Sequence, residues 1–205
     1  DVCSSDLVAS LDLRGGRVLA KLENLQRTGS FKVRGGLAAV SAARKEDPTG
    51  AVISASAGNH GLGVAYAATK LGLRATVVVP ANESAAKVKK LKTFDIELIQ
   101  HGATYDEAQT EAMRIADERS IRYVSPFNDT HVIAGQSTLF SELFEQVPDL
   151  QHLVVPVGGG GLISGAILAR EAAGLHGVKI TAVQPQNSFA RSEEHTSELQ
   201  SHSFI

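Results

Sequence analysis

A lysine at the start of a predicted helix is the first residue whose type and position suit covalent chemistry. Ser30-Phe31-Lys32-Val33-Arg34-Gly35-Gly36 follows the turn Thr28-Gly29 and opens a segment of helical period, with Ser30 expected as its cap. Lys32 then lies in the first helical turn, where the helix dipole and desolvation lower the pKa of an amine and make it a better carbonyl nucleophile. The alternative is an ordinary surface lysine with its charge in water.

A run of four glycines is the second candidate. Gly158, Gly159, Gly160 and Gly161 follow a predicted strand and precede a helix that starts at Leu162. Consecutive glycines can adopt positive φ and turn several N–H groups toward one point, and the helix dipole adds positive potential, so the segment is suited to hold a phosphate. It has neither the lysine of a P-loop nor the spacing of a dinucleotide fingerprint, which disfavours a nucleoside triphosphate. A flexible turn without a ligand is the alternative.

A second turn between a predicted strand and a helix, Ser54 to Gly61, is rich in small residues. Its exposed N–H groups and the Ser56 hydroxyl suit a carboxylate, and Asn59 can hydrogen-bond a planar ligand unless it only caps the helix. His60 has no acidic neighbour in this loop that would orient it as a general base. No His or Cys spacing indicates a metal site, and no Gly-x-Ser-x-Gly elbow indicates a serine hydrolase.

The elements around these segments alternate between strand and helix patterns. Short apolar, β-branched runs are followed by longer runs of helical period, which predicts an α/β fold with parallel sheets and helices on both faces. The Gly-rich turns then meet at the carboxyl edge of the sheet, where α/β proteins bind ligands. The expected strands are 18–22, 51–54, 75–79, 97–100, 122–124, 153–157 and 179–183, and the expected helices are 31–44, 60–71, 84–94, 105–119, 131–146 and 162–173.

The composition predicts a globular protein that acts on a small molecule. The 205 residues are 43% hydrophobic and carry a net charge of -2 without a basic stripe, so neither nucleic acid nor a membrane is expected as a partner. No apolar run approaches the roughly 20 residues of a membrane helix, and the N-terminus has no signal-peptide pattern. The single cysteine, Cys3, excludes an internal disulfide framework, and a cytoplasmic location is expected.

The two ends of the chain can be encoded by one inverted DNA repeat. Residues 1–7 and 191–197 correspond to a DNA stretch and its reverse complement, and this DNA resembles a short-read sequencing adapter whose continuation extends through His202. We therefore expect residues 1–7 and 191–205 to be adapter-derived and non-native, so that Cys3, His195 and His202 have no catalytic or metal-binding role. An ordinary polar tail is the alternative.

The three candidate segments together resemble the fold-type-II pyridoxal-phosphate (PLP) enzymes, which have a tryptophan synthase β-like fold, and most closely the threonine/serine dehydratase (ammonia-lyase) family. The segment from Lys21 to Gly35 is similar to the family's cofactor-lysine segment, 56–61 to its substrate-carboxylate loop and 158–162 to its phosphate loop. Ser125-Pro-Phe-Asn-Asp129 and Ile133-Ala-Gly-Gln136 match the pattern between them. Order and spacing agree over 8–190.

This resemblance implies a role for each candidate residue. Lys32 would bond covalently to the PLP aldehyde and remove the substrate α-proton, Asn59 would hydrogen-bond the ring hydroxyl, and the phosphate would rest on the loop made by Gly158, Gly159, Gly160, Gly161 and Leu162. The substrate carboxylate would bind to Ser56, Ala57, Gly58, Asn59 and His60. The implied reaction converts L-threonine or L-serine to a 2-oxo acid and ammonia. The implied domains are a large one from 8–50 and 128–190, and a small mobile one from 51–127.

Some features of this chain differ from the family pattern, and they narrow the function that the resemblance implies. Racemase relatives carry a hydroxyl residue where Ala57 stands, so racemisation is disfavoured but stays the alternative, together with a non-catalytic protein that binds an anion or amino acid. Gln184 stands where some relatives have an acidic cation ligand, so no divalent site is expected there. Family members continue past Ala190, so we expect this chain to lack the C-terminal part, to be inactive or nearly so and to expose apolar surface. The full-length form is expected to be a homo-oligomer.

Overall fold

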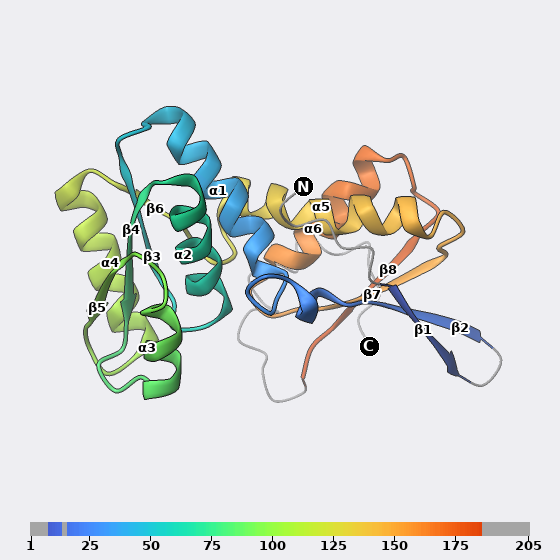
Figure 1. The fold of residues 1–205 in the computed structure, drawn as a ribbon. Helices are drawn as coiled ribbons and strands as arrows, with labels where there is room; N and C mark the ends of the chain where they lie inside the picture. The colour runs from blue at the N-terminus through green and yellow to red at the C-terminus, as the bar shows by residue number, and fades with distance from the viewer. Residues whose placement is uncertain (1–7, 14–15, 186–205) are drawn as a thin grey trace.

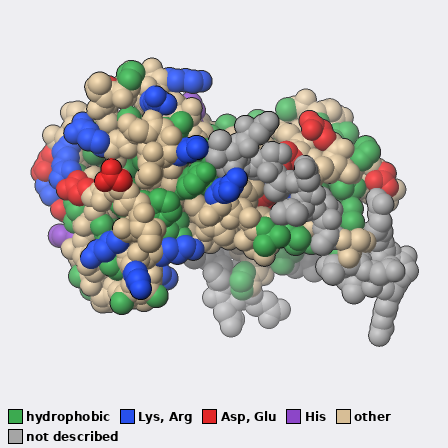
Figure 2. Space-filling view, in the orientation of Figure 1, with side chains coloured by type: hydrophobic (Ala, Val, Ile, Leu, Met, Phe, Trp, Pro, Cys, Tyr) green, Lys and Arg blue, Asp and Glu red, His purple; other side chains and the backbone are tan. Residues whose placement is uncertain are grey.

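The protein forms two lobes that meet at one helix (Figure 1). The computed structural model describes residues 8–13 and 16–185, so the predicted non-native ends and the last residues of the predicted large domain lie outside the described part of the chain. Lys and Arg side chains are spread over the lobe at the left of Figure 2, with Asp and Glu among them. In the described residues, no helix is long and apolar enough to cross a membrane.

The four-stranded lobe is a parallel sheet with helices on both faces. Its strand order is β5-β4-β3-β6, from β3 (Ala51–Ala55), β4 (Arg74–Val79), β5 (Glu97–Gln100) and β6 (Arg122–Tyr123). Val77 and Val79 pack on α2 (Asn59–Leu71) and α3 (Ala85–Leu91), whereas Val78 packs on α4 (Tyr105–Arg119). Both faces of β4 are therefore buried, which explains its continuous apolar run.

The two-stranded lobe contains a smaller parallel pair, β7 (His152–Pro156) and β8 (Lys179–Val183). One face packs on α5 (Thr130–Gln146) and α6 (Gly161–Ala172) through Leu153 and Val155. On the other face Val154 is 61% exposed and Val183 is 43% exposed. This face therefore presents apolar side chains to the solvent, in line with the apolar surface expected from the sequence. A hairpin, β1 (Val8–Leu13) and β2 (Gly16–Lys21), precedes a short 3-10 helix η1 (Glu23–Leu25).

Helix α1 (Lys32–Glu46) lies between the lobes and contacts both at glycines. A Cβ on Gly36 would meet the Gly63 backbone of α2 at 2.6 Å, and a Cβ on Gly135 of α5 would meet the Arg34 carbonyl oxygen at 2.6 Å. The backbones of α2, α1 and α5 thus touch without an intervening layer of side chains. This close packing holds the start of α1 between the two lobes.

The predicted fold class is confirmed, and most element boundaries agree within two residues. The prediction was wrong for residues 18–22, which were expected in a parallel sheet: residues 18–21 pair antiparallel with β1, and Leu22 lies outside the strand. The residue pattern of a strand does not show whether its partner runs parallel or antiparallel, so the sequence did not indicate this pairing. Helix α3 is also shorter than the expected 84–94.

Candidate active site

Lys32 is the first residue of α1, as the sequence predicts. The predicted cap was wrong: the N-cap is Phe31, with φ -58 and ψ -20, and it makes no side-chain capping bond. The Ser30 hydroxyl instead accepts a hydrogen bond from the Lys32 backbone N–H at 3.3 Å. Phe31 already has helical φ and ψ, and the Ser30 hydroxyl still satisfies an N–H of the first turn, so the assigned helix start differs from the predicted one by one residue.

The side chain of Lys32 points into the protein and not into water. Its Nζ donates a hydrogen bond to the Pro126 carbonyl oxygen at 2.6 Å and lies 5.4 Å from the centre of the Phe31 ring. Burial lowers the pKa of the Lys32 amine from its usual value. A larger fraction of the amine is then neutral at a given pH, and the neutral amine is the form that attacks a carbonyl.

The four glycines form a tight loop between β7 and α6. Gly160 has φ +87, a conformation that favours glycine, and α6 begins at Gly161. A Cβ on Gly159 would meet the Phe127 ring at 2.6 Å, and one on Gly161 would meet the Phe127 backbone at 3.1 Å, whereas nothing described lies within 4 Å of a Cβ on Gly158. The loop is therefore closed against Phe127 on one side and open beside Gly158.

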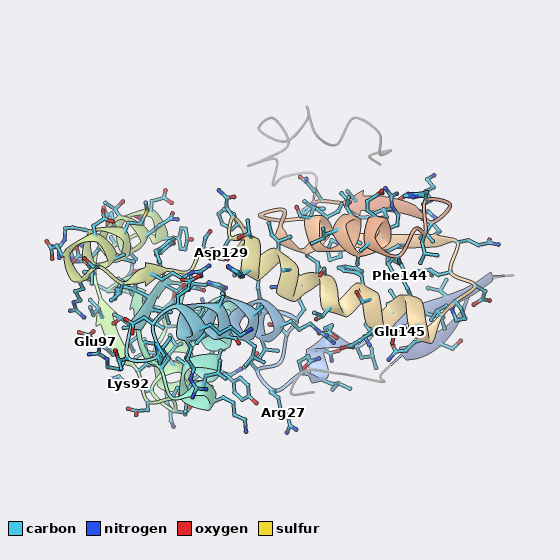
Figure 3. All side chains as sticks on the ribbon, turned by 90° about the horizontal axis from the view of Figure 1, so that it is seen from above. Arg27, Lys92, Glu97, Asp129, Phe144 and Glu145 are labelled. Atoms are coloured by element: carbon cyan, nitrogen blue, oxygen red, sulfur yellow. The ribbon has the colours of Figure 1, made fainter. Side chains whose placement is uncertain are left out.

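Residues 124–129, here called the linking segment, join β6 to α5 and bring these groups together. Pro126 accepts from Lys32, and the next residue, Phe127, packs against the glycine loop. Asp129 caps α5 by accepting from the backbone N–H of His131 at 2.8 Å and pairs with Arg122 at 3.1 Å. Asp129 lies at the start of α5, at the junction of the two lobes (Figure 3). The Lys32 amine and the glycine loop thus meet on adjacent residues of one segment.

The Ser56–His60 turn lies between β3 and α2, at the carboxyl edge of the four-stranded sheet. Its cap is Gly58, and the exposed Asn59 is the first helical residue, so the alternative that Asn59 serves only as the cap is wrong. The Ser56 hydroxyl accepts from the Gly58 N–H at 3.2 Å. A Cβ on Gly61 would overlap the Ser56 carbonyl oxygen, so the turn closes tightly on α2.

His60 is buried and anchors this turn to the linking segment. Its Nε2 lies 3.0 Å from the Val124 carbonyl oxygen, which can only accept, so we assign the ring proton to Nε2. Burial lowers the pKa of His60 to about 4, and the positive charge of Lys32 adds to the lowering. A ring that stays neutral down to this pH is a weak base, which favours an anchoring role over general-base catalysis.

The buried His60 is expected to make the protein less stable in mild acid. Its pKa falls from 6.5 in the unfolded chain to about 4 in the fold, so its contribution is fully present above pH 6.5 and is lost as the pH falls toward 4. The difference corresponds to about 3 kcal/mol. Denaturant titrations at several pH values should give a smaller slope of stability against pH for His60→Gln, which keeps a donor for Val124 but does not titrate. Equal slopes would contradict this prediction.

Two contacts of the site were not predicted as functional. The carbonyl groups of Val124 and Pro126 hold His60 and Lys32, yet a backbone oxygen leaves no trace in residue type. The sequence pointed to this region only through Ser125-Pro-Phe-Asn-Asp129, which has the residue types of a turn and matches the family pattern. Leu162 lies within the first turn of α6 and packs against the core of the two-stranded lobe.

An apolar cavity of about 860 Å³ lies elsewhere, on the two-stranded lobe between β2, β7 and the second half of α5. Phe31 and Leu162 reach its edge, but Lys32, Asn59 and the glycines do not line it. A well-formed apolar cavity is often the default site, but here the polar and reactive groups converge on the linking segment instead. Within the described residues, no cluster of His, Cys, Asp or Glu could hold a metal ion.

Comparison with known proteins decides the family. The model of the pyridoxal-phosphate dependent enzymes matches residues 5–203. The chain belongs to this family. An L-threonine ammonia-lyase of Thermotoga maritima is 43% identical over 176 residues, which are 86% of this chain and 44% of that relative. The chain therefore spans less than half the length of this PLP-family relative.

Solved structures of PLP-family members have the same fold. The processed form of threonine deaminase isoform 2 from Solanum lycopersicum is 34% identical, with a TM-score of 0.80 over 91% of this chain and 50% of that one. Maize serine racemase is 33% identical, with a TM-score of 0.82 over 89% of this chain and 55% of that one. These comparisons confirm the predicted family and the PLP cofactor.

The described residues fit this cofactor. PLP carries an aldehyde and a phosphate, and the structure offers a half-buried amine at Lys32 and a glycine loop open at Gly158. The loop precedes the N-terminus of α6, whose dipole favours an anion. A side chain on Gly159 would collide with Phe127 and one on Gly161 would be tightly packed against it, so the glycines allow this close approach of the loop to Phe127.

Proposed function

We propose that this chain contains the cofactor site of a PLP-dependent ammonia-lyase that converts L-threonine, L-serine or both to a 2-oxo acid and ammonia. The observation that carries the proposal is the position of Lys32 Nζ, 2.6 Å from the carbonyl oxygen of Pro126, whose neighbour Phe127 packs on the glycine loop. The relatives named threonine ammonia-lyase support the choice of reaction.

The proposed roles follow from the chemistry of each group. The Lys32 amine holds the cofactor aldehyde, Asn59 the ring hydroxyl, and Gly158 to Leu162 the phosphate. The turn from Ser56 to His60 binds the substrate carboxylate through backbone N–H groups and the Ser56 hydroxyl. When bound, PLP supplies an electron sink for charge at the substrate α-carbon. Lys32 Nζ takes up the α-proton, and the lowered pKa of this amine keeps it available as a base.

The parts of the proposed site come from different parts of the fold. The proposed carboxylate turn belongs to the four-stranded lobe, the proposed phosphate loop to the two-stranded lobe, and Lys32 to the helix between them. The division into a mobile domain at 51–127 and a large domain at 8–50 and 128–190 fits these places and stays a prediction. Closure of such a domain would exclude water from the site. A cytoplasmic location and a homo-oligomeric full-length form also stay predictions.

Two other functions remain as competitors. A racemase needs a second acid or base on the opposite face of the substrate, and Ala57, which is 9% exposed in the carboxylate turn, cannot transfer a proton. A non-catalytic protein that binds an anion would use the glycine loop without Lys32. The first would form D-serine from L-serine, and the second would show no visible absorbance with PLP.

The proposal is tested with the 205-residue chain and with a chimera in which residues 8–185 replace the matching segment of the Thermotoga maritima relative. The chain alone is expected to take up PLP at Lys32, with visible absorbance but little or no turnover. The chimera is expected to release 2-oxo acid and ammonia from L-threonine or L-serine, followed with a coupled assay. A chimera that folds but gives neither absorbance nor 2-oxo acid would remove the proposal, and one that forms D-serine would replace it.

A further inference from the structure

Arg34, two residues after Lys32 in α1, is the centre of a buried cluster of charged side chains. The Arg34 side chain is 1% exposed, and its Nε and Nη2 donate to Glu23 at 2.8 and 2.9 Å. Nη1 and Nη2 donate to Glu142 at 2.7 and 2.8 Å, and Nη1 also donates to Thr138 at 3.1 Å. These bonds use all five N–H donors of the guanidinium group.

The cluster ties three distant segments together. Glu23 belongs to η1, Arg34 to α1, and Glu142 with Thr138 to α5. Lys21 at the end of β2 also donates to Glu142, at 3.1 Å. Burial disfavours a charged guanidinium, but the hydrogen bonds to Glu142 and Glu23 outweigh it and raise the pKa of Arg34, so the residue stays charged. A lysine cannot replace this planar, two-sided contact.

The other contacts of this part of α1 include close approaches at two glycines. Gly35 faces Val132 and Gln136 of α5, and Gly36 faces the Gly63 backbone of α2. The Val132 and Gln136 side chains fill the space beside Gly35, whereas the Gly36 contact has no side chain between the two backbones. The N-cap Phe31 makes no side-chain capping bond either. Arg34 is therefore the residue of the first turn of α1 whose side chain forms ion pairs with two other segments, and it lies two residues from Lys32.

We propose that Arg34 is a positioning residue, which fixes the first turn of α1 between Glu23 and Glu142 and so sets the place from which Lys32 reaches the cofactor aldehyde. This inference rests on the proposed function of Lys32 and goes beyond it. A displacement of a reacting atom by about 1 Å can slow a reaction about 100-fold, so a loosened anchor two residues from Lys32 is expected to slow cofactor attachment.

The test measures how fast PLP attaches to Lys32. The 205-residue chain is mixed with PLP, quenched with borohydride at successive times, and digested so that the mass of the Lys32 peptide reports attachment. Arg34→Lys keeps the charge but loses the planar contacts, and we expect attachment about tenfold slower. The pH of half-maximal rate should be unchanged, because burial and not a neighbouring charge lowers the pKa of Lys32, and Arg34→Lys keeps the positive charge. The matched control is Arg114→Lys on the exposed face of α4, expected to stay within about twofold of the parent.

The outcomes separate the possible roles. Circular dichroism at the working temperature shows that each variant is folded, so a residue that only adds stability would leave the attachment rate unchanged. A folded Arg34→Lys variant at the parent rate overturns the inference, as does a slower rate with a shifted pH midpoint, which would indicate an effect on amine protonation. If Arg34→Lys does not fold, Glu23→Gln keeps an acceptor for Arg34 and decides the question by the same criteria. A parent chain labelled elsewhere than at Lys32 would instead refute the proposed function.

Discussion

Lys32→Met is expected to abolish covalent attachment of PLP while the fold stays about as stable as before. Methionine keeps the length and the apolar part of the side chain but has no amine. The lost amine is desolvated, and its removal relieves the cost of a partly buried charge, whereas Pro126 loses its donor. These effects oppose each other, so we expect the free energy of unfolding to change by no more than about 1 kcal/mol.

Mass spectrometry after borohydride reduction and denaturant titration measure the two quantities in the same preparation. In the chimera with the Thermotoga maritima relative, the same change should also remove 2-oxo acid formation. The matched control is Lys70→Met in the last turn of α2, where the side chain is exposed and cofactor attachment should persist. Attachment of PLP to a folded Lys32→Met variant, or turnover by it, would take the proposed role away from Lys32.

Gly61→Ala is expected to cause the largest loss of stability among the glycine substitutions in the proposed carboxylate turn. The added methyl group would overlap the Ser56 carbonyl oxygen, so either the turn or the start of α2 must move. Overpacking against backbone costs about 3 kcal/mol, because a backbone atom cannot rotate away as a side chain can. Denaturant titration of the 205-residue chain measures the loss.

Gly58→Ala is the control within the same turn. Nothing described lies within 4 Å of a Cβ on Gly58, and its φ of -103 is open to any residue, so the change in stability should stay below about 1 kcal/mol. In the chimera, a folded Gly61→Ala variant should need more L-threonine for half-maximal rate, because Ser56 has moved. Equal stability of the two variants would show that the turn is looser than the structure indicates.

The sequence predicts the fold well where periodicity and turn chemistry agree. Helix α4 begins at Tyr105 as expected because Thr104 and Glu107 form a capping box, and β4 is visible as a buried β-branched run. The antiparallel pairing of 18–21 with β1 was missed, because direction depends on a partner strand. The cap of α1 was predicted one residue too early, because Phe31 precedes the helix in helical conformation while the Ser30 hydroxyl accepts from the Lys32 N–H.

The candidate site is less predictable than the fold, because its contacts join distant residues through the backbone. Lys32 and the four glycines have recognisable residue types, but nothing in the type of Pro126 indicates that its carbonyl oxygen binds an amine 94 residues away. The contact between Arg34 and Glu142 is likewise a consequence of how α1 and α5 cross. Such pairs become visible only when the helices are packed.

The glycine contacts of α1 limit how the two lobes can move. Gly36 meets the Gly63 backbone on one side, and Gly135 meets the Arg34 carbonyl oxygen on the other. Sliding of α2 along α1 would bring larger side chains into a gap that only glycine fits, and it would force the axes apart. Rotation about an axis through the Gly36 contact keeps that gap intact. For the predicted mobile domain 51–127 we therefore expect a pivot at this contact, which would swing the Ser56–His60 turn through an arc at a constant distance from the pivot.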